Sequence, residues 1–223
     1  MKNLLIVVHP DRSDAISIGL DFAKLASENG FVPLTNRSDL LVGVKEFNSN
    51  DALDCVVVFG GDGTILRAAE IARNTEAPII GINLGKVGFL AEISKPSLKE
   101  ILEAIKVNKL IVEPRLTIAY KIIRDDKEVE SGWALNEVVV ERSNTSLLEL
   151  FVQIDNRPLS RWACDAVICS TPTGSTAYAF SAGGPVVWPE VDAMILLPLA
   201  AHALFSDPMV VSPSSVVVVD IES

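Results

Sequence analysis

Short β-branched runs alternate with helix-like segments through the first half of the chain, and this alternation restricts the fold more than any other feature. The predicted strands are Asn3–Val8, Phe31–Thr35, Asp54–Phe59 and Pro78–Ile82, and the predicted helices are Ser13–Asn29, Thr64–Arg73 and Ser97–Val107. Ser13 is suited to cap the first helix and Gly30 to end it. Apolar strands separated by helices are typical of parallel βαβ units. We therefore expect an α/β amino-terminal domain with a parallel, Rossmann-like sheet.

The pattern changes after Lys109, where strand-like runs follow one another with few helical signals. The predicted strands are Leu116–Arg124 and Glu128–Trp133, which flank Asp125-Asp126-Lys127 as a hairpin, then Leu135–Arg142 and Leu147–Asp155. We place the domain boundary at residue 108, so that an α/β domain covers residues 1–108 and a mainly β carboxyl-terminal domain covers residues 109–223. Ligands often bind where two domains meet, so we expect a ligand site in a crevice between them.

Composition narrows the class of protein. The 223 residues are 49% hydrophobic and 22% charged, which is typical of a folded chain rather than a disordered one. A formal net charge of -10 opposes binding to a nucleic-acid backbone. Apolar runs such as Leu4–Val8 are far shorter than the ~20 residues that cross a bilayer, and no signal-peptide cleavage region follows this run. We therefore expect a cytoplasmic enzyme without a nucleic-acid or membrane partner.

Cysteine and histidine are too sparse to suggest a metal or disulfide framework. Cys55, Cys164 and Cys169 form no CxxC pair and lie in apolar surroundings, so they predict buried thiols. His9 and His202 are too far apart in the sequence to nominate a metal cluster, although either could act singly. No set of metal ligands is predicted.

The segment Gly60–Thr64, which reads GGDGT, follows a predicted buried strand and precedes a helix. Glycines in this place let backbone amides approach phosphate beside the helix amino terminus. Asp62 would repel a phosphate unless it holds a metal ion or takes a proton from an attacking hydroxyl. The alternative is that Asp62 only caps the following helix. Arg67, one turn later, could reach a phosphate or could be an ordinary surface arginine.

Two further segments combine polar residues with apolar strands. Asn136 and Glu137 interrupt an apolar run and could hydrogen-bond a ribose or an adenine amino group, or could simply mark a solvent-exposed strand end. Ser170–Pro185 is rich in hydroxyls and glycines around Tyr178, which suggests a polar, aromatic ligand, although an ordinary loop remains open. Asp165 precedes the apolar run before this loop. We expect its carboxylate to lie at a strand mouth, that is, at the end of a strand, and to face the loop. There it would either bind a ligand or cap the loop.

Four segments, taken in order, resemble the NAD kinase family. They are GGDGT, NLGKVGFL (83–90), ALNEVVVER (134–142) and DAVICSTPTGSTAYAFSAGGP (165–185). The similarity begins at IVVHP (6–10) and extends to HALFSDPMVVSP (202–213). GGDGT alone is shared with diacylglycerol and sphingosine kinases, whereas TPTGSTAY favours the NAD kinases.

The resemblance implies an activity and a set of partners. A kinase of this type transfers a phosphoryl group from ATP, with Mg assisting, to the 2′-hydroxyl of the adenosine ribose of NAD, and NADP is the product. Some members are implied to accept polyphosphate as donor. A cytoplasmic homodimer or homotetramer is expected.

Several residue roles follow from the same resemblance. Asp62 corresponds to the proton acceptor, and Gly63 and Arg67 to ligand-contacting positions. Asn136 and Glu137 correspond to the dinucleotide-binding pair. The loop positions that hold NAD correspond to Thr176, Ala177, Tyr178, Ala179, Phe180 and Ser181, with Thr173 and Phe89 as weaker candidates.

The sequence departs from the family pattern in two places. Asp165 corresponds to the acidic residue near the nicotinamide end, but Ala166 follows it where the family usually has glycine. The chain ends at Ser223 where relatives continue through further strands, so we expect the second domain to lack part of the dinucleotide pocket. Two alternatives remain: a lipid kinase of the diacylglycerol type, which the hydroxyl-rich loop disfavours, and a non-catalytic NAD-binding module.

Overall fold

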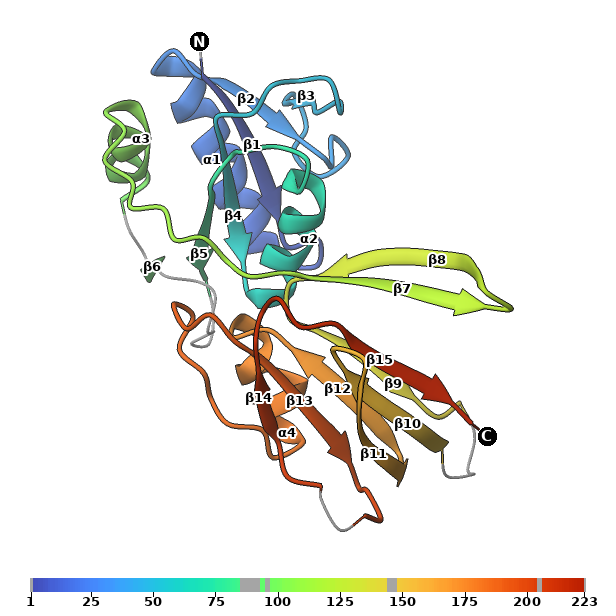
Figure 1. Ribbon diagram of the computed structural model, residues 1–223. Helices are drawn as coiled ribbons and strands as arrows, with labels where there is room; N and C mark the ends of the chain where they lie inside the picture. The colour runs from blue at the N-terminus through green and yellow to red at the C-terminus, as the bar shows by residue number, and fades with distance from the viewer. Residues whose placement is uncertain (1, 85–92, 95–96, 144–147, 204–205, 223) are drawn as a thin grey trace. The chain divides into compact units, whose positions relative to one another are not determined.

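The computed structural model describes residues 2–84, 93–94, 97–143, 148–203 and 206–222 (Figure 1). The chain divides into two compact units, one formed by residues 1–113 and the other by residues 114–223. Within the described residues, no helix is both long enough and apolar enough to span a membrane.

The first unit is the expected α/β structure with a parallel sheet. In chain order its elements are β1 (Asn3–Val8), α1 (Ser13–Glu28), β2 (Val32–Thr35), β3 (Lys45–Glu46), β4 (Cys55–Gly60), α2 (Asp62–Ala72), β5 (Ile79–Asn83), β6 (Ile93–Ser94) and α3 (Leu98–Lys106). The strands are ordered β3-β2-β1-β4-β5-β6 and every adjacent pair is parallel. The order reverses direction at β1, so the carboxyl ends of β1 and β4 lie at a switch point where ligands commonly bind.

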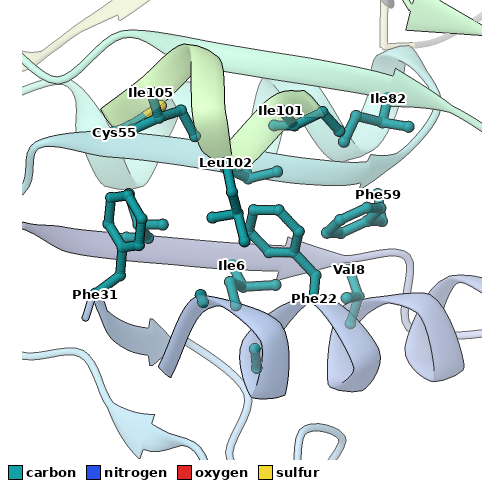
Figure 2. Close-up of a cluster of buried hydrophobic side chains, with 14 of the residues drawn as sticks. Ile6, Val8, Phe22, Phe31, Cys55, Phe59, Ile82, Ile101, Leu102 and Ile105 are labelled. Carbon is teal, nitrogen blue, oxygen red and sulfur yellow. The ribbon is translucent and has the colours of Figure 1, made fainter. Parts of the chain in front are cut away.

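The two faces of this sheet are buried against different helices. Leu4, Ile6 and Val8 of β1 belong to a core shared with α1 and α3, which Figure 2 shows in close-up, whereas Leu5 and Val7 belong to a core shared with α2. In the first core the rings of Phe22 and Phe59 meet edge to face, with their centroids 5.4 Å apart. Burial on both faces explains why the strands read as continuous apolar runs.

The predicted end of the first helix is confirmed and its predicted cap is wrong. Gly30 has a φ of +83°, a conformation that glycine adopts without strain, and its amide bonds to the Ser27 carbonyl. Arg12 occupies the N-cap position, and the helix has no side-chain cap hydrogen bond, so Ser13 lies in the first turn.

The second unit is mainly β, as the sequence predicts. Its elements are β7 (Ile118–Arg124), β8 (Lys127–Ala134), β9 (Glu137–Glu141), β10 (Leu148–Ile154), β11 (Arg157–Cys164), β12 (Ala166–Ser170), the 3-10 turn η1 (Thr173–Thr176), α4 (Tyr178–Ser181), β13 (Met194–Leu199), β14 (Met209–Val211) and β15 (Val217–Ile221). The strands form a hairpin β7-β8 and two antiparallel sheets, β11-β10-β15 and β14-β13-β12-β9. One core cluster takes side chains from both of these sheets, including Leu150, Trp162 and Leu196.

The predicted hairpin is confirmed, but its turn has two residues rather than three, because Lys127 begins β8 and pairs with Arg124. Asp125 and Asp126 have φ values of 51° and 58°, the left-handed pair that a tight hairpin turn needs. Tyr120 lies across Gly132 on the facing strand, so close that a Cβ at Gly132 would be 2.6 Å from the ring. The glycine therefore makes room for the aromatic ring.

Candidate active site

The GGDGT segment forms a bare turn between β4 and α2. A Cβ at Gly60 would lie 2.4 Å from Oγ1 of Thr64, so the turn closes tightly on itself there. Gly61 and Gly63 have nothing within 4 Å of the place where a Cβ would stand. Open space beside glycines at a helix amino terminus is what a phosphate group requires.

Asp62 is the first residue of α2 rather than its cap. Gly61 occupies the N-cap position, and α2 has no side-chain cap hydrogen bond. The capping alternative is therefore wrong for this carboxylate, which is half-buried beside the open turn. Arg67 lies one turn further along α2 and is exposed, so its role stays a prediction.

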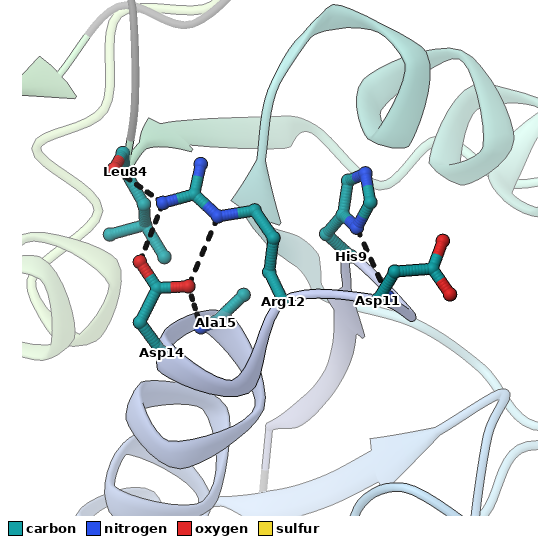
Figure 3. A network of polar contacts seen from close by, with 6 residues as sticks. All are labelled: His9, Asp11, Arg12, Asp14, Ala15 and Leu84. Carbon is teal, nitrogen blue, oxygen red and sulfur yellow. Dashed lines mark hydrogen bonds and ion pairs between the residues drawn. The ribbon is translucent and has the colours of Figure 1, made fainter.

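The loop after β1 lies beside the loop after β4. The amide of His9 donates to the carbonyl of Phe59 at 3.0 Å, which extends the pairing of the two strands to the start of GGDGT. Arg12 donates through Nη2 to the carbonyl of Leu84, 2.6 Å away, and through Nε to Asp14, 3.0 Å away (Figure 3). The hydrogen bond from Arg12 holds the pKa of Asp14 below its usual range. This network ties the amino terminus of α1 to the end of β5.

In the second unit the structure brings Asn136 and Glu137 against the hydroxyl-rich loop. Asn136 lies between β8 and β9, and its carbonyl accepts a hydrogen bond from the Thr171 amide at 2.8 Å. Glu137 begins β9 and pairs with Ser170 at the end of β12. Oδ1 of Asn136 and Oε2 of Glu137 are buried without a hydrogen-bond partner among the described residues. The exposed-strand-end alternative is therefore wrong, and two buried polar atoms are left for a ligand.

Burial also shifts the pKa of Glu137. Desolvation raises the pKa of its carboxyl above the usual glutamate value, and a hydrogen bond from the Tyr178 backbone amide opposes this change only in part. A carboxyl with a raised pKa and one unpaired oxygen is typical of a binding or catalytic position. It is suited to accept hydrogen bonds from ribose hydroxyls or an amino group.

Gly174 holds this arrangement together by having no side chain. A Cβ there would stand 2.2 Å from the carbonyl oxygen of Asn136 and 2.6 Å from Oγ of Ser170. The turn η1 can therefore pack directly on the backbone that precedes β9.

Most hydroxyls of the loop support the loop itself. Oγ of Ser175 donates to the Pro172 carbonyl at 2.6 Å and accepts from the Val187 amide at 2.9 Å. Oγ1 of Thr171 donates to the Leu135 carbonyl at 2.6 Å. The interpretation that the hydroxyls as a group face a ligand is therefore wrong for these two side chains, which shape the loop instead.

The predicted NAD-holding residues divide by burial. Ala179 is fully buried against Ile168 and Ile195, so its side chain belongs to the core. Thr173 is buried as well. The residues with accessible surface are Thr176, Ala177, Tyr178, Phe180 and Ser181.

Asp165 does not face this loop. It precedes β12, and the loop follows β12, so the two lie at opposite ends of a strand that spans about 13 Å or more at the usual rise per residue. Oδ1 of Asp165 is 3.3 Å from Nε of Arg142, at the far end of β9 from Glu137. The expected placement at a strand mouth facing the loop is therefore wrong, because the whole length of β12 separates Asp165 from the loop.

Some predicted positions cannot be placed. Phe89 and the rest of 85–90 lie outside the described residues, as do Leu204 and Phe205 of the carboxyl-terminal shared segment. In the part of the chain that is described, no three His, Cys, Asp or Glu side chains gather as a metal-binding group.

Sequence reasoning missed two residues beside the GGDGT turn. Asn36 follows β2 at the same edge of the sheet, and its Oδ1 is buried without a partner among the described residues. His9 was noticed only as an isolated histidine. Their places directly after strands of a parallel sheet were the available signal.

Comparisons with known proteins identify the family. Residues 34–109 match the ATP-NAD kinase N-terminal domain, and residues 135–223 match the ATP-NAD kinase C-terminal domain. The NAD kinase of Nocardia farcinica is 41% identical over a region that covers 98% of this chain and 75% of that protein. The NAD kinase of Mycobacterium bovis is 40% identical, with coverage of 100% and 79%.

Solved structures support the same relationship. An NAD kinase from Archaeoglobus fulgidus in complex with ATP matches with a TM-score of 0.73 and 31% identity, covering 99% of this chain and 81% of that one. Yeast NADH kinase complexed with NADH matches with a TM-score of 0.91, covering 100% and 73%, and at 24% identity it shows the fold alone. Both domains of the family are thus matched in order along the sequence. The chain belongs to the NAD kinase family.

Proposed function

We propose that this NAD kinase transfers the terminal phosphoryl group of ATP to the 2′-hydroxyl of the adenosine ribose of NAD, with Asp62 accepting the proton of that hydroxyl. The family, its curated relatives and the ATP-bound neighbour support an enzyme that uses NAD and ATP. They do not favour a lipid kinase or a non-catalytic module. The observation that carries the residue assignment is the pair of buried, unpartnered oxygens on Asn136 and Glu137.

These two side chains are suited to hold the acceptor. A buried carboxylate or amide oxygen without a partner gains a hydrogen bond when a ribose hydroxyl or an adenine amino group arrives. The exposed ring of Tyr178, with 37% of its surface accessible, offers an apolar face beside the amide that bonds to Glu137. The proposal therefore assigns NAD to the surface formed by the start of β9 and the start of α4.

The GGDGT turn is suited to the transferring phosphates. The backbone amides at the start of α2 stabilise negative charge, and the bare glycines let phosphate oxygens approach them. Asp62 is the carboxylate that this turn offers to the attacking hydroxyl. Its removal should stop transfer without removing the surface that binds NAD.

A magnesium ion fits this donor set. Magnesium keeps several waters and takes one or two carboxylates together with substrate phosphates, rather than a cage of many protein ligands. Asp62 is the carboxylate that the turn provides, and the bound ion would neutralise charge on the phosphates.

The test is NADP formation by purified protein with ATP, Mg and NAD, together with NAD binding by calorimetry. Asp62→Asn is expected to abolish NADP formation while NAD binds as before, because the amide keeps the shape and loses the base. Glu137→Ala is expected to weaken NAD binding while leaving ATP binding unchanged. Phosphorylation of diacylglycerol in place of NAD, or NAD binding without transfer to any acceptor, would contradict the proposal.

The cytoplasm and a homodimer or homotetramer are part of the same proposal. The cysteines of the chain are free, which suits a reducing compartment. Light scattering during gel filtration measures the oligomeric state directly. A monomer at assay concentration would contradict this part.

A further inference from the structure

We propose that the strand ends after β1 and β2 bind the phosphoryl donor alongside GGDGT, with Nε2–H of His9 donating to a phosphate oxygen and the side chain of Asn36 contacting the nucleoside. This rests on the proposed function, because it assigns residues to the donor of that reaction. It adds two residues that lie outside GGDGT in the sequence.

The pairing of the strands places these residues close together at one edge of the sheet. β1 lies between β2 and β4, and Ile6 pairs with Thr35 on one side while Val8 pairs with Phe59 on the other. The same register places Asn36 beside Val7 and His9 beside Gly60, so Asn36 lies two residues behind His9 at the carboxyl-terminal edge of the sheet. Two strand spacings and this stagger separate Asn36 from Gly60 by about 12 Å.

The three positions share one face of the sheet. Leu34, Val7 and Val58 all belong to the core that packs on α2. Asn36, His9 and Gly60 follow them by two residues, and alternate residues of a strand point to the same face. These positions therefore lie on the side of the sheet where α2 packs, at the edge where α2 begins.

The hydrogen bond of His9 determines which of its nitrogens is a donor. The amide of Asp11 donates to Nδ1 of His9 at 3.2 Å (Figure 3). Nδ1 is therefore an acceptor, and the proton of the neutral ring is on Nε2. In Figure 3 the second ring nitrogen points away from Asp11 and from the Arg12 network. This half-buried N–H group is suited to a phosphate oxygen.

Asn36 requires a different part of the donor. Its Oδ1 is buried and has no partner among the described residues, whereas its neighbour Arg37 bonds twice to Asp39, at 2.8 and 2.7 Å. An ionised phosphate chain has no hydrogen to donate to an amide oxygen. The hydroxyl and amino groups of a nucleoside do, so Asn36 is assigned to the nucleoside and His9 to the phosphates.

Two probes separate these roles: ATP as substrate and inorganic tripolyphosphate as an inhibitor competing with ATP, both at excess Mg and saturating NAD. In His9→Asn the new amide oxygen can still accept from Asp11, but nothing reaches the place of Nε2; in His9→Gln the longer amide restores a donor there. His9→Asn is expected to raise the KM for ATP and the Ki of tripolyphosphate together, by about tenfold, as the loss of one hydrogen bond to a charged group predicts. In His9→Gln both constants are expected to stay near those of the unaltered protein.

Asn36→Ala is expected to raise the KM for ATP by about tenfold and to leave the Ki of tripolyphosphate unchanged, because tripolyphosphate has no nucleoside. The KM for NAD should not move in any of these variants. Asn50→Ala, which changes an exposed asparagine of the same unit, is the matched control and should behave like the unaltered protein.

The proposal is overturned if His9→Asn leaves the KM for ATP and the Ki of tripolyphosphate unchanged, or if His9→Gln raises them as much as His9→Asn does. It is also overturned if Asn36→Ala raises the KM for ATP and the Ki of tripolyphosphate equally. If the unaltered protein forms no NADP, the proposed function fails separately. Calorimetric binding of ATP and tripolyphosphate to the same variants then decides the donor site, since binding needs no turnover. Absence of ATP binding to the unaltered protein would also overturn the proposed donor site.

Discussion

Gly174→Ala is the most direct test of how the second unit builds its ligand surface. The added Cβ would stand 2.2 Å from the Asn136 carbonyl oxygen, and real Cβ contacts essentially never fall below 3.0 Å. The neighbouring atom is backbone, so η1 and the Asn136 segment must separate by at least the difference, 3.0 − 2.2 = 0.8 Å. That displacement acts directly on the two side chains assigned to NAD.

Two magnitudes follow from this displacement. Forced overpacking of this kind costs about 1–3 kcal/mol of unfolding free energy, and each kcal/mol lowers the Tm by about 2–4 °C in a chain of this length. A shift near 1 Å in a binding constellation can reduce catalytic efficiency by about 100-fold. We therefore expect a moderate loss of Tm with a large loss of kcat/KM for NAD, while the KM for ATP stays unchanged.

The assay is NADP formation at varied NAD and at varied ATP, combined with thermal unfolding followed by circular dichroism. Gly30→Ala is the matched control for lost stability, because its φ of +83° makes alanine strained while no atom lies within 4 Å of the new Cβ. It should lower the Tm and keep the KM for NAD. The reasoning is refuted if Gly174→Ala keeps the kcat/KM for NAD of the unaltered protein, or if Gly30→Ala loses it equally.

Three further outcomes can be measured. Gly63→Ala has nothing within 4 Å of its new Cβ, so the Tm should be unchanged or higher. The KM for ATP should rise, because the methyl occupies the phosphate side of the turn. An unchanged KM for ATP would contradict the proposal that phosphate uses this space. Glu137→Gln should stabilise the fold at neutral pH: the raised pKa of Glu137 means that its contribution is fully present below the ordinary glutamate value and is lost as the pH rises through the folded value. In denaturant titrations the advantage of Gln should therefore grow from pH 4 to pH 8, and a constant difference would refute the cause. Burial raises the pKa of Cys55 to about 12, so a thiol reagent at pH 8 should modify it only as the protein unfolds, which a reaction rate that follows added urea would verify.

The local patterns of the sequence were sufficient to predict the main strands and helices of the first unit. Each apolar run became a strand of the parallel sheet, and the two-residue strands β3 and β6 were too short to leave a pattern. Gly30 ended its helix as predicted, whereas Ser13 lost the cap position to Arg12. Boundaries of this kind depend on a few backbone hydrogen bonds, which the sequence does not display.

The candidate site was predicted in part. The sequence identified Asn136, Glu137 and the loop after Ser170, and the structure brings them into contact. Asp165 was misplaced although the order of the sequence excludes that placement, because Asp165 precedes β12 and the loop follows β12, at the opposite end of the strand. The sequence could not separate hydroxyls that support the loop, such as that of Ser175, from groups left for a ligand.

The central place of β1 in its sheet affects how the protein is made. This strand is synthesised before both of its neighbours, and the second of them is residues 55–59, so β1 leaves the ribosome long before both of its edges can be paired. Until then Leu4–Val8 is an uncharged, β-prone apolar segment, the kind that joins other chains in aggregates. Yield in a heterologous host should therefore depend on chaperones and on translation speed between the codons of β1 and those of β4, rather than on the stability of the finished enzyme.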